Sequence, residues 1–147
     1  MTNRIDIHQL EPKAYQAMFG LEGYLAETDL TPTLKELIKL KASMINKCAY
    51  CIQMHSEQAR IHGESEQRIY ALPAWQESPL FTSEERAVLA LTEEVTLISE
   101  QGLSDATYQG CLEFFSEQQV AQLIMQIVTI NTWNRLAVAT KLVYQGS

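Results

Sequence analysis

The chain has 147 residues, of which 46% are hydrophobic and 20% are charged. This length suits one domain over residues 1–147, which can bury roughly 70% of its unfolded surface without cross-links. A net charge of −7 is unsuited to a nucleic-acid backbone. The longest apolar runs have five residues, whereas a membrane-spanning helix needs about 20. Composition therefore argues against nucleic-acid and membrane partners.

The cysteine content points to chemistry rather than to a disulfide scaffold. Three cysteines are too few and oddly numbered for such a scaffold. The first residues contain no apolar segment behind a basic start, so we expect a cytoplasmic location. In that compartment the close pair Cys48 and Cys51 indicates redox or metal chemistry.

Helical spacing dominates the chain, and no window alternates with the period of a strand. We therefore expect an all-α, compact fold of about seven helices, with the CxxC pair at the N-terminal end of a helix. Capping residues precede the expected helices. These caps are Thr31 (followed by Pro32), Asn46, Thr82, Ser104 and Ser116.

The ends of these helices are also marked. The helix that carries the cysteines is expected to stop at His62, before Gly63. The next long helix runs through Val95 to about Ile98. The segment Leu72–Phe81 contains two prolines and a tryptophan, and this pattern predicts a packed loop.

The last expected helix, Ser116–Val143, is apolar on more than one face. A chain of this size would leave part of such a helix uncovered, and soluble monomers rarely expose large apolar patches. We therefore expect a homo-oligomer in which this helix contributes to the subunit contact, with Ile127 and Ile130 in the interface or in the core.

The strongest chemical signal is the spacing of Cys48, Cys51 and His55, which share one helical face. A thiolate is favoured by the first turn of a helix and by an imidazole four residues away. Residues 31–54 also contain four lysines and one glutamate, in a chain that is acidic overall. This pattern predicts thiol redox chemistry.

Other interpretations of the same residues remain open. The cysteines would also suit a small apolar packing role. Zinc is a minority interpretation, because structural zinc sites usually draw ligands from separate segments. By pattern alone, Glu36 is a solvated charge paired with Lys39 or Lys35.

The segment from Glu36 to His55, with its Glu…CxxCxxxH spacing, resembles the alkylhydroperoxidase AhpD-like core of the carboxymuconolactone decarboxylase family. Residues 81–92 and 130–139 look like the second half of the same family. The resemblance covers about residues 12–140 and implies a small all-α antioxidant fold. The family's lactone decarboxylases lack the paired cysteines, so their chemistry is disfavoured here.

The resemblance implies a thiol peroxidase that reduces hydrogen peroxide or organic hydroperoxides. Cys51 would be the peroxidatic thiolate and Cys48 its disulfide partner. His55 would relay the proton, with Glu36 behind it through water. In some lipoyl-linked members a histidine stands between the cysteines, where this chain has Tyr50, which makes that residue an accessory candidate.

The partners implied are a hydroperoxide and an external dithiol, either a dihydrolipoyl protein or a thioredoxin-like protein. No metal or organic cofactor is required, and trimers or hexamers are the expected assemblies. Two alternatives keep the same residues in other roles. The first is a thiol–disulfide oxidoreductase or redox sensor without efficient peroxide turnover, and the second is a non-enzymatic, zinc-stapled helical assembly module.

Five further residues are interpreted mainly as structural. We expect Cys111 to be structural packing and His8 to lie on the surface. His62 shares the face of His55, but beside Gly63 it is expected to bind helix C-terminal carbonyls. Trp133 and Arg135 are pocket candidates, although a tryptophan on an apolar helix more often lies in a core or interface.

Overall fold

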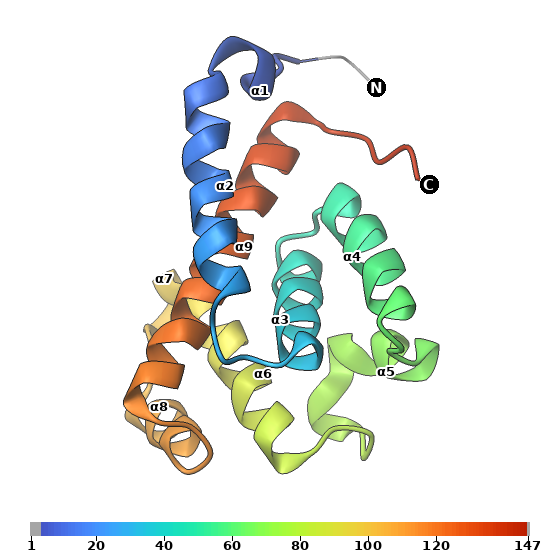
Figure 1. Ribbon diagram of the computed structural model, residues 1–147. Coiled ribbons are helices and arrows are strands. Elements are labelled where there is room, and N and C mark those ends of the chain that lie inside the picture. The colour runs from blue at the N-terminus through green and yellow to red at the C-terminus, as the bar shows by residue number, and fades with distance from the viewer. Residues whose placement is uncertain (1–3, 147) are drawn as a thin grey trace.

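The computed structural model describes residues 4–146, and this part of the chain contains helices and no strand, which confirms the all-α class (Figure 1). None of the helices in this range is long and apolar enough to cross a membrane. The helices are α1 (Ile7–Leu10), α2 (Pro12–Ala26), α3 (Pro32–Ile45), α4 (Ala49–Ile61), α5 (Glu66–Ala71), the 3₁₀ helix η1 (Leu72–Glu77), α6 (Ser83–Thr96), α7 (Ile98–Gln101), α8 (Asp105–Leu112) and α9 (Glu117–Thr140).

Four of the predicted caps are confirmed. In each, a side-chain oxygen accepts a hydrogen bond from a backbone N–H in the first helical turn, which satisfies a donor that has no partner within the helix. Thr82 and Ser116 also form complete capping boxes with Glu85 and Gln119. The confirmed caps are Thr31, Thr82, Ser104 and Ser116.

Three boundaries differ from the sequence-based expectation. The cap of α4 is Cys48 rather than Asn46. Helix α9 ends at Thr140 rather than near Val143, because Lys141 adopts a left-handed conformation (φ 55°, ψ 44°) that stops the helix. The segment expected to be a loop begins with η1, although it is packed as predicted, since Trp75 is only 6% exposed.

Helix α3 lies at the centre of the fold, between α9 on one side and α4 on the other, with α6 also packed against it. It joins two apolar clusters. Ile38 belongs to the cluster built with α6, α8 and α9, while Leu37 and Leu40 belong to the cluster built with α4, α5, η1 and α6. All three side chains are fully buried. This burial fixes α3, and therefore Glu36 and Lys39, against α4.

One chain covers most of α9 but not all of it, as expected. Ile127 and Ile130 are 0% and 1% exposed within a single chain, so they belong to its core. Helices α2, α3, α4, α6 and α8 all pack against α9. Val128 and Val138 are the large apolar side chains of α9 that remain exposed. The homo-oligomer itself remains a prediction, but it must use other side chains.

Candidate active site

Cys48 and Cys51 occupy the start of α4 and are joined by a disulfide bond. Cys48 is the N-cap, and its sulfur accepts the backbone N–H of Cys51 at 3.2 Å. Both residues are 1% exposed. The predicted helix-start context is therefore confirmed, and the unpaired N–H groups of this first turn favour a sulfur anion when the pair is reduced.

A polar seam with α9 holds the turn that precedes Cys48. The Asn46 amide donates to Asn131 Oδ1 at 3.0 Å and to Asn134 Oδ1 at 2.9 Å, and Asn134 donates to Ser43 Oγ at 3.0 Å. Asn46 therefore binds α9 instead of capping α4. The next residue, Lys47, takes a left-handed backbone (φ 54°). These contacts set where α4 begins and so position both cysteines.

His55 lies one helical turn after Cys51 and is 7% exposed. Burial is the main cause that lowers its pKa to about 4, and the positive charge of Lys39 lowers it further, while a hydrogen bond with Gln58 acts in the opposite direction. The imidazole is therefore neutral at pH 7, and the lowered pKa makes it a weaker base than an ordinary histidine. Its Nδ1 atom is buried and has no hydrogen-bond partner within residues 4–146.

Glu36 is buried, not solvated as its pattern alone indicated, with 5% of its surface exposed. Its Oε1 atom lies 3.3 Å from Lys39 Nζ and 3.5 Å from His62 Nδ1. Its Oε2 atom is buried without a hydrogen-bond partner in the described chain. Of the two expected lysine partners, Lys39 pairs with Glu36, whereas Lys35 donates to the Leu25 carbonyl at 2.8 Å.

His62 is the C-terminal cap residue of α4, as its position predicted, and Gly63 follows with φ 93°. The imidazole, however, does not bind the helix carbonyls as expected. It faces the Glu36 carboxylate and is 54% exposed. An ionised carboxylate is a stronger acceptor than a peptide carbonyl, which favours this position of the His62 imidazole.

A cavity of about 440 Å³ opens beside Cys51, and we call it the aromatic pocket. Cys51 is among its lining residues, and Cys48 is not. Helices α1, α2, α3, α4 and α9 and the segment after α9 all contribute to its wall. The lining residues are His8, Tyr15, Phe19, Glu22, Lys39, Tyr50, Cys51, Met54, His55, Gln58, Ile130, Trp133, Leu136, Ala137 and Leu142.

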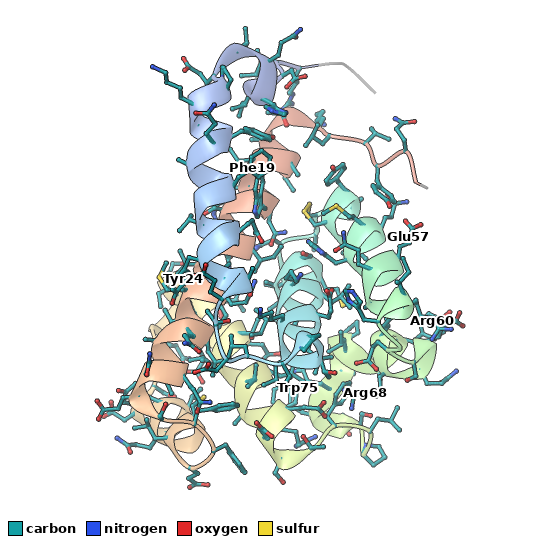
Figure 2. All side chains as sticks on the ribbon, in the orientation of Figure 1. Phe19, Tyr24, Glu57, Arg60, Arg68 and Trp75 are labelled. Carbon is teal, nitrogen blue, oxygen red and sulfur yellow. A yellow bond between two sulfur atoms is a disulfide. The ribbon has the colours of Figure 1, made fainter. Side chains whose placement is uncertain are left out.

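Four of the aromatic rings that line the aromatic pocket pack against one another. His8 stacks on Tyr15 with ring centres 4.4 Å apart, and Trp133 meets Tyr15 edge to face at 5.4 Å. Phe19 projects from α2 and lies 6.1 Å from the Trp133 ring (Figure 2). Trp133 Nε1 donates to Glu22 Oε1 at 2.9 Å, which fixes the indole. This wall favours an apolar ligand.

Two of these wall residues were weighed in the sequence. His8 is exposed, as expected, and it also lines the pocket. Trp133, a pocket candidate, lines the pocket as well, and it packs against the core cluster that contains Ile130. Arg135 lies elsewhere, with its guanidinium on Asn131. Tyr15 and Phe19 were missed altogether, because no local spacing indicates that α2 packs on α9 more than 100 residues later.

Tyr50 also stands in the pocket wall, and a C-terminal residue holds it. The Tyr144 ring meets the Tyr50 ring edge to face at 5.7 Å, and the Tyr144 hydroxyl donates to Glu57. The segment after α9 therefore packs on α4, and Leu142 from this segment reaches the pocket.

A second cavity, of about 260 Å³, lies at the other end of the α3–α4 pair, and we call it the polar pocket. Arg68 from α5 bridges two carboxylates there, with Nε 3.0 Å from Glu64 Oε2 and Nη2 2.6 Å from Glu85 Oε2 (Figure 2). It shares no lining residue with the aromatic pocket. Its lining residues are Pro32, Thr33, Glu36, Ala59, His62, Gly63, Glu64, Arg68 and Glu85.

Cys111 is fully buried in the cluster of α3, α6, α8 and α9, as the packing interpretation predicted. Burial, together with the nearby Glu94 carboxylate, raises the pKa of its thiol to about 11. Cys111 is therefore a protonated, unreactive thiol at neutral pH. Across residues 4–146, no three or more His, Cys, Asp and Glu side chains gather as a metal site would require, so the zinc alternative gains no support there.

Comparison with known proteins identifies the class. The family model described as the carboxymuconolactone decarboxylase family matches residues 12–94, which include Glu36, both helix-start cysteines and His55. The uncharacterized protein YdfG of Bacillus subtilis is 39% identical over 139 residues, which are 95% of each chain. The chain belongs to the carboxymuconolactone decarboxylase family.

Solved structures refine this class. A protein of unknown function from Agrobacterium tumefaciens, ATU0492, described as a candidate antioxidant defence protein AhpD, is 37% identical with a TM-score of 0.96, over 99% of this chain and 100% of that one. The debrominase Bmp8 has a TM-score of 0.82 at 22% identity, over 94% of this chain and 74% of its own, which shows a shared fold alone. The fold is AhpD-like, as the resemblance implied.

Proposed function

We propose that this protein is a thiol-dependent peroxidase that reduces hydroperoxides through the Cys48–Cys51 pair. The observation that carries the proposal is the asymmetry of the pair. Cys51 lines the aromatic pocket beside a neutral, buried His55, whereas Cys48 lies behind it as the helix cap, already bonded to Cys51. These positions support a role for Cys51 as the reactive thiol, His55 as the proton acceptor and Cys48 as the resolving thiol, beside a cavity for the substrate.

The first chemical step consumes the peroxide. His55 accepts the proton of the Cys51 thiol, and the thiolate attacks one peroxide oxygen. The S–O bond forms as the O–O bond breaks, and the departing alkoxide takes the proton from His55. The products are the Cys51 sulfenic acid and an alcohol, or water when the substrate is hydrogen peroxide.

The next steps restore the thiols. The Cys48 sulfur attacks the sulfenic sulfur, forms the disulfide and releases water. An external dithiol then exchanges with the disulfide, becomes oxidised itself and returns both cysteines to thiols. Each cycle thus converts one hydroperoxide and one dithiol into an alcohol, water and one disulfide, without another redox group.

The aromatic pocket favours an organic hydroperoxide over hydrogen peroxide, because its apolar rings gain more from burying an apolar group than from a small polar molecule. Lys39 brings a positive charge into this wall, where it favours the thiolate and the developing alkoxide. Dihydrolipoyl and thioredoxin-like proteins remain the proposed reductants.

A stopped-flow comparison tests the proposal. The reduced protein is mixed with hydrogen peroxide or with cumene hydroperoxide, and dihydrolipoamide is added to regenerate it. We expect disulfide formation to be faster with cumene hydroperoxide. A slow reaction with both peroxides, combined with rapid exchange with the dithiol, would instead favour a thiol–disulfide oxidoreductase or redox sensor.

The homo-oligomer, a trimer or hexamer, is also part of the proposal. Since Ile127 and Ile130 are core residues, the exposed Val128 on α9 is the better interface probe. Light scattering during size-exclusion chromatography should show an assembly larger than 16.7 kDa. Val128→Glu should reduce that mass while the helical circular dichroism is retained, and a wild-type monomer at micromolar concentration would contradict the assembly.

A further inference from the structure

Cys48 and Cys51 are held by different parts of the fold. Cys51 lies in the first turn of α4, on the same helix as His55, so the peroxide step described above uses cysteine and histidine side chains of one helix. Cys48 is the N-cap and has an extended backbone (φ −90°, ψ 97°). The turn that joins α3 to α4 therefore decides where the Cys48 sulfur lies relative to Cys51.

The backbone of Cys48 also closes α3. Its N–H group donates to the Ser43 carbonyl at 3.0 Å, and the N–H group of Lys47 donates to the Met44 carbonyl at 3.2 Å. These two bonds form a Schellman motif, in which the residue with the left-handed backbone is usually glycine. Here that residue is Lys47 (φ 54°), and a side chain is disfavoured in this region. The turn therefore depends on stabilising contacts from elsewhere in the fold.

The polar seam with α9 supplies those contacts. The amide nitrogen of Asn46 carries two hydrogens, and both are used, one on Asn131 and one on Asn134. On the solvent side, Asn131 Oδ1 also accepts from the Arg135 guanidinium at 2.9 Å. On the inner side, Asn134 is fully buried and donates to Ser43. Because hydrogen bonds are directional, such a buried polar contact favours one register between two helices. The seam thus holds the α3–α4 turn in one position on α9.

We propose that Asn46 and its partners on α9 are positioning residues for the resolution step, in which Cys48 closes on the oxidised Cys51. The inference rests on the proposed peroxidase function. The Cys48 sulfur attacks the sulfenic sulfur of Cys51, the S–S bond forms as the S–O bond breaks, and the departing hydroxide leaves as water with the Cys48 proton. The Cα atoms of the pair are 5.3 Å apart, within the range that a disulfide needs. A turn held in this position lets the two sulfurs meet without movement of the backbone.

The position of the resolving thiol matters because a second peroxide molecule competes for the sulfenic acid. A sulfenic acid that meets peroxide before it meets Cys48 becomes a sulfinic acid, which ends the cycle. Groups held in reacting geometry react far faster than loosely held ones, and a displacement of about 1 Å can slow a reaction about a hundredfold. Loss of the seam should therefore slow resolution. The peroxide step should be nearly unchanged, because Cys51 and His55 keep their places on α4.

The test measures how the oxidised protein divides between two products. The reduced protein is mixed with cumene hydroperoxide and no reductant, so each molecule ends either as the disulfide or as over-oxidised Cys51, and mass spectrometry measures both. For Asn46→Ala we expect the peroxide concentration that over-oxidises half of the protein to fall about tenfold. The rate of sulfenic acid formation, followed by trapping with dimedone at early times, should change by less than about twofold. An equal slowing of both steps would overturn the proposal.

Two further variants separate positioning from general loosening of the fold. Ser43→Ala removes a buried hydroxyl that accepts from the Asn134 amide, and we expect a smaller fall, of about threefold. The matched control is Thr129→Val, because Thr129 is also fully buried on α9 but its hydroxyl donates to Met125 within the same helix. This control should lower the thermal midpoint and keep the wild-type division of products. An equal fall in the control, or a wild-type division in both seam variants, would contradict the positioning role.

Failure of the proposed function would be visible separately, as a wild-type protein that does not react with peroxide. The seam is then tested through the equilibrium between the Cys48–Cys51 disulfide and glutathione, which needs no peroxide. A displaced Cys48 closes the disulfide less readily. In Asn46→Ala the equilibrium constant for disulfide formation should therefore fall about tenfold, which raises the reduction potential by about 30 mV. Thr129→Val should keep the wild-type potential, and an unchanged potential in Asn46→Ala would show that the seam does not position the pair.

Discussion

The two pockets at opposite ends of the α3–α4 pair differ in almost every property. The aromatic pocket is walled by rings and aliphatic side chains from five helices and the C-terminal segment, whereas the polar pocket is built from a histidine, an arginine and three carboxylates. Apolar walls select a substrate by burial, and charged walls do not. The candidate reactive residues Cys51 and His55 therefore line the apolar pocket, whereas the polar pocket is lined by ion pairs.

The pockets also differ in how far apart in the sequence their lining residues lie. Most polar-pocket residues lie within 31 positions of one another, from Pro32 to Gly63, and the two Arg68 salt bridges join residues 4 and 17 positions apart. The aromatic pocket brings His8 beside Trp133 and Leu142. Its shape therefore depends on the docking of both chain ends onto the centre of the fold.

The largest effect is expected at the cysteines, which decide whether the aromatic pocket is the reactive one. Cys51→Ser should abolish the reaction with peroxide, because it removes the thiol that lines the pocket. Cys48→Ser should still form a sulfenic acid, which over-oxidises in excess peroxide because no resolving thiol remains. Mass spectrometry of peptides from the treated proteins measures both outcomes.

Two results would reverse this assignment. If Cys48→Ser did not react with peroxide, the roles assigned to the two cysteines would be reversed. A disulfide that includes Cys111 in the oxidised wild-type protein would contradict the pairing. Cys111→Ala is the matched control and should retain turnover, because that thiol is buried in the core with a raised pKa.

The next effect concerns acid stability and tests whether the aromatic pocket keeps His55 neutral. The folded pKa of about 4 lies below the ordinary value of 6.5. Between these values the unfolded chain binds the additional proton, so the free energy of unfolding falls as the pH decreases from about 6.5 to about 4. A shift of this size is worth up to about 3 kcal/mol.

Urea unfolding of the oxidised protein at several pH values measures this loss. His55→Gln serves as the comparison, because glutamine does not titrate and other groups contribute equally to both proteins. We expect the difference in unfolding free energy between wild type and variant to change by about 3 kcal/mol across this range. A constant difference would mean that His55 is charged or solvated in the folded protein.

Sequence reasoning succeeded where the relevant contacts are local. The caps at Thr31, Thr82 and Ser116 need only the following turn, and the face shared by Cys51 and His55 needs only one helix. These features follow from helical geometry. The same geometry, with the family resemblance, led to the all-α fold and to the residues at the start of α4.

Sequence reasoning failed where contacts between distant segments determine the position of a side chain. Asparagine is a common helix cap, but the Asn46 amide donates its hydrogen bonds to Asn131 and Asn134 on α9 instead. Glu36 has the spacing of a surface charge, but the packing of α4 against α3 buries it. The apolar faces of α9 left open whether Ile127 and Ile130 lie in the core or in an interface, because the sequence does not reveal how many helices surround them.

A smaller effect tests the selectivity of the aromatic pocket. Trp133→Ala should raise KM for cumene hydroperoxide about tenfold, equivalent to roughly 1.4 kcal/mol of lost apolar contact. The reaction with hydrogen peroxide should change by less than about twofold, because that molecule makes little use of the ring wall. Steady-state kinetics with both peroxides measures the ratio.

The second tryptophan supplies a matched control for this experiment. Trp75 is buried in η1, where its Nε1 donates to Glu93 Oε1 at 2.8 Å, away from the aromatic pocket. Trp75→Phe should therefore lower the thermal midpoint without changing the ratio of the two peroxide activities. If both tryptophan variants changed the ratio equally, the selectivity would reflect general loosening of the fold rather than contact with the substrate.

The smallest effect belongs to the polar pocket, where the ion pairs are partly exposed. The Arg68 side chain is 18% exposed and that of Glu85 is 11% exposed. Pairs near the surface are screened by water, whereas a buried carboxylate that loses its partner is costly, so we expect a coupling energy of roughly 1–2 kcal/mol.

A double-mutant cycle with Arg68→Met and Glu85→Gln, measured by urea unfolding, isolates this energy from the loss of each side chain. The coupling should weaken as salt is raised, because the pair is open to solvent at its rim. A coupling near zero would mean that water already screens these charges, and the two pockets would then differ in their ligands but not in how their walls are held together.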